Sequence, residues 1–142
     1  SNKSLPYNIV NSKIWSLGAN IFIPAAASRL VEMKNINNLI NNGLNVISCG
    51  ANIPFKEKKI FYGEVTKYLD ERIFLIPDFV ANSGMARVFS YLMKKNPIIN
   101  DESIFSDVSK TIKSTMLKSF KQNKNKFFFT KTSLQIAINE LI

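Results

Sequence analysis

The stretch LNVISCGANIP, residues 44–54, indicates the fold more clearly than any other part of the chain. Its first five residues contain Leu44, Val46 and Ile47, which is typical of a short strand buried in a parallel sheet. The following residues are small or carry amides, and Pro54 ends them, which is typical of a turn. This stretch therefore predicts a buried strand that ends in a loop, as in α/β folds.

Two similar stretches lie on either side of it. Residues 19–27 (ANIFIPAAA) and residues 73–84 (IFLIPDFVANSG) also combine β-branched or aromatic residues with small ones. Stripes of apolar residues predict helices between and after these stretches. Strands are thus expected at 19–27, 44–48 and 73–76, and helices at 31–42, 60–69 (with Gly63 in its interior) and 84–95. Gly43 is expected to end the first helix. This alternation predicts parallel βαβ units with right-handed crossovers.

The pattern becomes helical after Pro97. Apolar residues recur every four positions from Ile104 to Phe120, which predicts one long amphipathic helix with Asp101 as its N-cap. A closing helix is expected around residues 134–141, with Thr130 as a candidate cap. The aromatic run at 127–129 is expected to dock this helix onto the body, although stacking on nucleic-acid bases is an alternative.

Composition excludes several classes of protein. The 142 residues are 46% hydrophobic and 20% charged, which excludes wholesale disorder and predicts one domain. Cys49 is the single cysteine, so an intrachain disulfide is excluded. The absence of histidine excludes a histidine base or triad, and no metal site is expected. The longest apolar run has seven residues, so we expect no membrane span and a cytoplasmic location.

The net charge is strongly positive, but it does not identify a binding partner. The formal net charge is +9, and seven lysines with no acid lie in residues 110–131. A basic domain can bind nucleic acid. However, only three of the 19 basic residues are arginines, and Lys, Asn and Ile together make up 51 residues, as in AT-rich coding sequences. We therefore expect solvated surface lysines rather than a nucleic-acid partner.

The ends of the three predicted strands are the expected ligand site, because parallel sheets bind ligands beyond their carboxyl ends. Small side chains there let a flat ligand approach the backbone, and two amides can bond it. The small residues are Ala25, Ala26, Gly50 and Ala51, and the amides belong to Asn52 and Asn82. Each could instead serve only a turn, Cys49 could be inert filler, and Asp78 could bond nearby backbone amides. The glycine-rich loop of a dinucleotide fold is absent, so only half of such a fold is expected.

Three of these stretches, ANIFIPAA (19–26), GANIP (50–54) and PDFVANSG (77–84), carry a family resemblance. In order and spacing, roughly across residues 15–95, the sequence resembles the NAD(P)-binding domain of the glutamate/leucine/phenylalanine/valine dehydrogenases. The resemblance implies half of a Rossmann-like doubly wound parallel sheet with C-terminal helices. It also implies an oxidative deaminase, which passes a hydride from an amino acid to NAD or NADP and releases a 2-oxo acid and ammonia.

The resemblance also implies roles for single residues. Ala25, Ala26, Gly50, Ala51, Asn52 and Asn82 would bind the nicotinamide half of the cofactor, Asn82 at the carboxamide and Asn52 near the ribose. Ala86 and Phe89 would border the amino-acid side chain. The sequence departs from the family pattern at Asn20, Cys49, Met85 and Phe89. The departures at Cys49 and Phe89 leave specificity for glutamate open.

The family's catalytic lysine and aspartate lie in an N-terminal domain with no counterpart here, so no catalytic residue is expected in this chain. We expect residues 1–13 to be poorly defined, 14–96 to be a partial dinucleotide-binding domain, and 97–142 to be a helical appendage packed on it. The chain alone is expected to be inactive, with substrate binding only alongside the N-terminal domain and oligomers for the full-length enzyme. A non-catalytic binding or regulatory remnant and a basic nucleic-acid-binding module are the alternatives.

Overall fold

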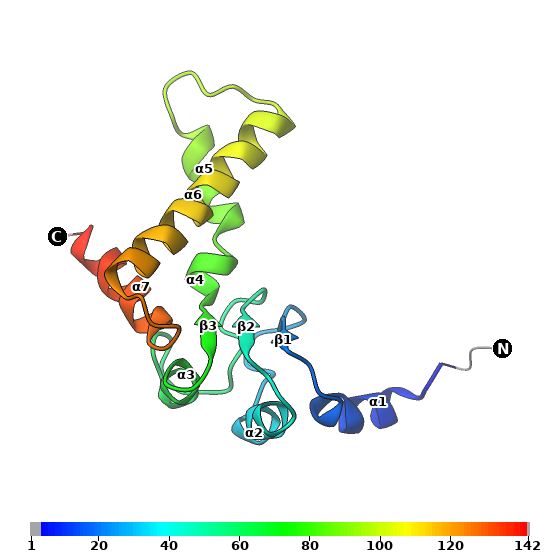
Figure 1. Cartoon of the computed structure of the whole chain (residues 1–142). Helices are drawn as coiled ribbons and strands as arrows, with labels where there is room; N and C mark the ends of the chain where they lie inside the picture. Colours follow the sequence, from blue (N-terminus) through cyan, green and yellow to red (C-terminus); the bar gives the residue numbers. More distant parts are fainter. Residues whose placement is uncertain (1–3, 142) are drawn as a thin grey trace.

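The centre of the molecule is a three-stranded parallel sheet (Figure 1). The computed structural model describes residues 4–141. The strands are β1 (Ile21–Phe22), β2 (Val46–Ser48) and β3 (Phe74–Ile76), in the order β1-β2-β3. Helix α2 (Met33–Asn41) connects β1 to β2, and α3 (Glu64–Asp70) lies between β2 and β3. The predicted α/β class and the parallel direction of the strands are confirmed.

The hydrophobic core joins the central strands to these two helices. Ile47 of β2 and Leu75 of β3 are fully buried, and they belong to one cluster with Ile36 of α2 and Leu69 of α3. Gly43 follows α2 with a φ of 94°, the left-handed conformation that glycine adopts without strain, as expected for a helix end. The apolar stripe of α2 and the part of the next stripe that falls in α3 therefore belong to the core.

The first strand differs from its prediction. It was expected at residues 19–27 with both faces buried, but β1 contains two residues, and Ile21 and Ile23 are each 60% exposed. β1 and β3 are the two edge strands, but α3 and α7 pack on β3, whereas no helix within residues 4–141 packs closely on β1. The next residue, Pro24, has no N–H and cannot extend the pairing.

The second predicted helix begins later than its apolar pattern suggests. Ile60 and Phe61 lie in an exposed loop, and Gly63 is the N-cap of α3 rather than an interior residue. The carboxylate of Glu57 accepts hydrogen bonds from the backbone N–H groups of Val65 and Thr66, at 2.9 and 3.2 Å. A side chain outside the helix therefore satisfies its first amides and sets its start.

The remaining helices extend from the end of β3. They are α4 (Asp78–Ala81), α5 (Gly84–Leu92), α6 (Asp101–Gln122) and α7 (Phe129–Asn139). Helices α5 and α6 form a hairpin that projects away from the sheet (Figure 1). The long helix is confirmed, but its N-cap is Asn100 rather than Asp101, because the Asn100 side chain accepts from the N–H of Ser103 at 2.8 Å.

Helix α7 returns to the sheet and docks through its first turn. Asp70, at the end of α3, accepts hydrogen bonds from the N–H groups of Thr130 and Lys131, at 2.8 and 3.0 Å. Thr130 was expected to be the cap, but Asp70 performs that role from 60 residues away. The Phe129 side chain is 1% exposed and packs on Phe74. The predicted docking of the last helix by the aromatic run is therefore confirmed at Phe129.

The N-terminal segment contains α1 (Tyr7–Lys13) and a 3-10 turn, η1 (Ile14–Ser16). Residues 1–3 of the expected poorly defined segment lie outside the described residues. Trp15 anchors the turn by an edge-on contact with the Phe22 ring, with centroids 5.8 Å apart. Within residues 4–141, no helix combines the length and apolar character that a membrane crossing requires. The same part of the chain contains no cluster of three metal-ligating Cys, Asp or Glu side chains.

Candidate ligand site at the strand ends

Two loops at the carboxyl ends of β1 and β2 are joined by hydrogen bonds. The N–H of Ala51 donates to the carbonyl of Pro24 at 2.7 Å, and the N–H of Arg29 donates to the carbonyl of Ile53, also at 2.7 Å. The hydroxyl of Ser28 donates to the carbonyl of Asn52 at 2.5 Å. The loops at residues 24–29 and 49–54 therefore form one continuous surface.

Gly50 allows the closest approach of these two loops. A Cβ atom added to Gly50 would lie 3.1 Å from the Cβ of Ala25, closer than nearly all such contacts. The small side chains that were predicted to leave room for a ligand therefore also let the two loops approach each other closely. Substitution of Gly50 would push the first loop away from the second.

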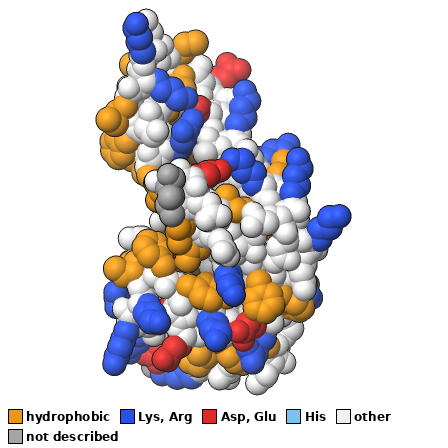
Figure 2. Space-filling model, turned by 90° about the vertical axis from the view of Figure 1, so that its left-hand side faces the viewer, with side chains coloured by type: hydrophobic (Ala, Val, Ile, Leu, Met, Phe, Trp, Pro, Cys, Tyr) orange, Lys and Arg blue, Asp and Glu red, His pale blue; other side chains and the backbone are white. Residues whose placement is uncertain are grey.

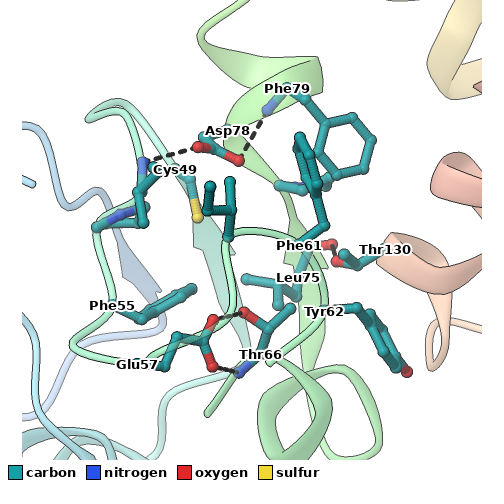
Figure 3. Close-up of a pocket in the computed structure, with 14 residues that line it drawn as sticks. Cys49, Phe55, Glu57, Phe61, Tyr62, Thr66, Leu75, Asp78, Phe79 and Thr130 are labelled. Atoms are coloured by element: carbon teal, nitrogen blue, oxygen red, sulfur yellow. Dashed lines mark hydrogen bonds between the residues drawn. The ribbon is translucent and has the colours of Figure 1, made fainter. Parts of the chain in front are cut away.

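Asp78 ties the third loop, residues 77–84, to the second loop, residues 49–54 (Figure 3). Its carboxylate accepts from the N–H of Ile53 at 2.7 Å and from the N–H of Phe79, in the first turn of α4, at 2.9 Å. Ile53 has a φ of 47°, a left-handed conformation that is costly for a β-branched residue. Its N–H bonds Asp78 and its carbonyl bonds Arg29, so both neighbouring loops hold this conformation. The alternative that Asp78 bonds a nearby backbone amide is confirmed at Phe79, whereas its bond to Ile53 was not predicted.

A small cavity lies beneath these loops, between the ends of β2 and β3 and the segment at residues 53–62 (Figure 3). Its volume is about 20 Å³, which is room for about one water molecule. Cys49 lines it, is 1% exposed, and has a thiol pKa raised by burial and, to a lesser degree, by the charge of Asp78. The cavity is too small for an organic ligand, and the thiol has the character of inert filler, as expected.

A larger hollow borders the first loop. Its volume is about 520 Å³, and α1, Trp15, β1 and residues 23–27 line it, including Ala25 and Ala26. The lining is largely apolar, which suits a flat aromatic or heterocyclic ring. The exposed small residues of the first loop therefore face an open apolar surface.

The predicted site residues fall into two groups. Ala25, Ala26, Gly50, Ala51 and Asn52 lie together in the first two loops. Ala51 is the one buried residue of this group, with an exposed fraction of 8%.

Asn82, Ala86 and Phe89 lie farther along the chain and are exposed. Asn82 ends α4, where its N–H donates to the carbonyl of Asp78 at 2.7 Å. Ala86 and Phe89 lie on α5. Within residues 4–141, no hydrogen bond joins Asn82 directly to the first two loops. Asp78 is therefore the link between the two groups.

The bonds that assemble these loops were not predicted from the sequence. Ser28 and Asn52 are 24 residues apart, and Asp78 and Ile53 are 25 apart. Ser, Asp and Asn after a strand also serve local turns, so their residue types do not identify distant partners. The one available signal was the shared position of all three loops at strand ends.

Basic side chains are not concentrated in one patch of the face that Figure 2 shows. Figure 2 shows Lys and Arg side chains scattered over both lobes of one face, among hydrophobic ones. Arg87 and Lys94 both bind the carboxylate of Asp107. Lys118, within the lysine-rich segment, pairs with Glu140 at 2.7 Å. Three of the basic side chains are therefore engaged by carboxylates of their own chain.

Comparison with known proteins identifies the family. The sequence profile of the glutamate/leucine/phenylalanine/valine dehydrogenases matches residues 2–139. The chain belongs to this family. It is 29% identical, over 90 residues, to an NADP-specific glutamate dehydrogenase of Psychrobacter sp. (strain TAD1), covering 63% of this chain and 19% of that protein.

A solved structure of this dehydrogenase family has the same fold. The glutamate dehydrogenase of Plasmodium falciparum superimposes with a TM-score of 0.57 and 18% identity, covering 89% of this chain and 29% of that chain. The chain therefore matches less than a third of the length of each of these dehydrogenases.

Proposed function

We propose that this dehydrogenase-family chain contributes the nicotinamide half of the cofactor-binding domain of an amino-acid dehydrogenase. The observation that carries the proposal is the junction of loops 24–29, 49–54 and 77–84 at the carboxyl end of a parallel sheet. Ligands bind at this end of open parallel sheets. In this proposal the chain binds NAD or NADP and takes part in oxidative deamination of an amino acid to a 2-oxo acid and ammonia.

The residues at the junction fit a nicotinamide riboside. Ala25 and Ala26 are exposed beside an apolar hollow, so an aromatic ring can lie against them. The exposed amides of Asn52 and Asn82 can each donate to and accept from a carboxamide or a ribose hydroxyl. The cofactor supplies the hydride acceptor, and the residues of this chain hold and orient it. Such positioning is a large part of catalysis by hydride transfer.

The choice between NAD and NADP involves the ribose at the other end of the cofactor. The Psychrobacter relative is NADP-specific, which favours NADP here. The nicotinamide half is common to both cofactors. Nicotinamide mononucleotide is therefore the direct probe of the proposed site.

The chain alone is proposed to lack turnover. The strand-end loops offer amides and small residues, while the buried thiol of Cys49 has a raised pKa and Asp78 is engaged by two backbone amides. None of these is an obvious general base or nucleophile. In this proposal, a substrate domain like that of the family supplies the catalytic groups, and Ala86 and Phe89 of α5 border the amino-acid side chain. Oligomers are expected of that complete enzyme.

The proposal is tested by titrating the isotope-labelled chain with nicotinamide mononucleotide, NAD and NADP, with detection by NMR. The expected result is a set of saturable amide shifts at Gly50, Asn52 and Asn82 for all three ligands. Ala25→Leu, which fills the surface, should abolish the shifts, while Asn41→Ala on α2 should leave them unchanged. Absence of saturable shifts, or shifts confined to residues 110–131, would refute the proposed site. Turnover of any amino acid by the chain alone would refute the proposed inactivity.

A further inference from the structure

The peptide that joins Asn52 to Ile53 is held at both of its polar groups by side chains of the other two loops. Its carbonyl accepts a hydrogen bond from the hydroxyl of Ser28 at 2.5 Å. Its N–H donates to the carboxylate of Asp78 at 2.7 Å (Figure 3). One of these side chains comes from the first loop and the other from the third, so all three strand-end loops meet at this single peptide.

The backbone around this peptide is also held. The N–H of Arg29 donates to the carbonyl of Ile53 at 2.7 Å, and the N–H of Val31 donates to the carbonyl of Pro54 at 3.0 Å. These backbone bonds attach the second loop to the first without either side-chain bond. Loss of one side-chain bond would therefore change the orientation of the Asn52–Ile53 peptide without detaching the loop.

The conformation of Ile53 favours the opposite orientation of this peptide. Its φ of 47° is left-handed, which is unfavourable for a β-branched residue. A half-turn of the peptide about the line between its two Cα atoms would bring Ile53 into the extended region, which β-branched residues prefer. The same half-turn would point the Asn52 carbonyl at the Asp78 carboxylate, and two acceptors that face each other repel. Asp78 therefore selects the observed orientation, and the Ser28 hydroxyl restrains it.

The orientation of the peptide affects the site because only the backbone aims the Asn52 amide. The Asn52 side chain is exposed, and within residues 4–141 no hydrogen bond joins its amide to another residue. The rotamers open to a side chain depend on the φ and ψ of its own residue, and a half-turn of the following peptide changes that ψ. A group that is already aimed at its ligand binds more tightly, because less order is imposed on binding.

We propose that Asp78 and Ser28 are positioning residues, which hold the Asn52–Ile53 peptide in the orientation that binds a nicotinamide riboside. This inference rests on the proposed cofactor site and adds to it two residues that act through Asn52. Without the carboxylate, the peptide turns and relieves the backbone of Ile53. The fraction of chains that are competent to bind then falls, and the apparent affinity falls in proportion to that fraction.

The orientation of the peptide is measured first in the free chain by NMR. The left-handed φ of Ile53 places its amide proton close to its own Hα, so the nuclear Overhauser effect between these two protons should be strong. It should be weak in Asp78→Ala and remain strong in Ser28→Ala, which keeps the carboxylate. Circular dichroism establishes that each variant is folded. A strong effect that persists in folded Asp78→Ala overturns the proposal.

Titration with nicotinamide mononucleotide then measures the effect on binding. Asp78→Ala should weaken binding about tenfold. Ser28→Ala should weaken it about threefold at an unchanged midpoint of thermal unfolding, and Ser28→Thr, which keeps the hydroxyl, should bind as the parent does. Thr132→Val is the matched control: it removes an exposed hydroxyl that donates to the Phe128 carbonyl at 2.8 Å in α7, and it should have no effect on binding.

Three results of this titration overturn the positioning role. The first is parent-like affinity in Asp78→Ala or in Ser28→Ala, and the second is a Ser28→Thr variant that binds no better than Ser28→Ala. Both leave the cofactor site itself standing. The third is a parent chain without saturable binding, which refutes the proposed cofactor site and the positioning role with it.

The Ile53→Gly background separates peptide orientation from the charge of Asp78. Glycine adopts the left-handed conformation without strain, so it does not drive the half-turn. Asp78→Ala should therefore weaken binding about threefold or less in this background, against about tenfold in the parent. An equal loss in the two backgrounds assigns the effect to charge alone and overturns the proposal.

Discussion

Removal of the Asp78 carboxylate is the sharpest test of how the strand-end loops are assembled. In Asp78→Ala, the N–H groups of Ile53 and Phe79 lose acceptors that lie at 2.7 and 2.9 Å. Hydrogen bonds to a charged group contribute about 1.5–3 kcal/mol each. Asp78 is only half-buried, so water can replace part of each bond.

Relaxation of the backbone at Ile53 opposes this loss of stability. The left-handed conformation of Ile53 costs about 1–3 kcal/mol, and part of that cost is released when the loop is free to relax. The two bonds together outweigh this release. We therefore expect the free energy of unfolding to fall by about 2 kcal/mol, with a new conformation at residues 49–54.

Urea denaturation followed by circular dichroism measures the free energy, and amide chemical shifts measure the loop. Asp78→Asn is the matched variant: its single amide oxygen can serve one of the two N–H groups, so it should lose roughly half as much. The shifts of Asn52 and Ile53 should change more in Asp78→Ala than in Asp78→Asn. The reasoning would be refuted if the free energy of unfolding of Asp78→Ala lay within about 0.5 kcal/mol of the parent value and the amide shifts of Asn52 and Ile53 were unchanged.

Three other predictions follow from the packing of the C-terminal helices. Asp70→Ala leaves two amides of the first turn of α7 without acceptors, so thermal or urea unfolding should show a loss of about 2–4 kcal/mol and hydrogen exchange should accelerate first in α7. Phe129→Ala empties a fully buried site and should cost about 3–5 kcal/mol, whereas Phe128→Ala, 40% exposed, should cost far less; equal losses would contradict the docking role. The hydrogen bond from Arg87, followed by that from a lysine, lowers the pKa of Asp107 from 3.8 to about 2. This carboxylate therefore stabilises the folded chain above pH 4 and loses that effect as the pH falls toward 2; an NMR titration should give the low value, and Arg87→Leu should raise it toward 3.8.

Much of the fold follows from local patterns. The three strands, helix α2 with its glycine end and the long helix α6 were all predicted, because apolar periodicity reports which face of an element is buried. The parallel direction followed from the alternation of strands and helices. Family membership followed from the residues after the strands, where small side chains and amides occur in a specific order.

The sequence interpretation was wrong about other features, for reasons that the structure identifies. Phe61 shares the helical spacing of α3 but lies in a loop, where its ring contacts that of Phe79 with centroids 6.3 Å apart. Periodicity cannot distinguish a helix face from a loop residue that packs on a distant partner. Ile21 and Ile23 were predicted to be buried, yet their exposure depends on which elements of the folded chain pack over them.

The sequence by itself determined the class of fold, the parallel direction of the strands and the kind of residue at their ends, because each follows from local patterns along the chain. Tertiary structure alone decided which carboxylate serves which amides: Asp78 holds Ile53, and Asp70 caps α7. These partners are 25 and 60 residues apart. A carboxylate bonds any N–H that folding brings within reach, so its partner is a property of the packed chain and not of its local pattern.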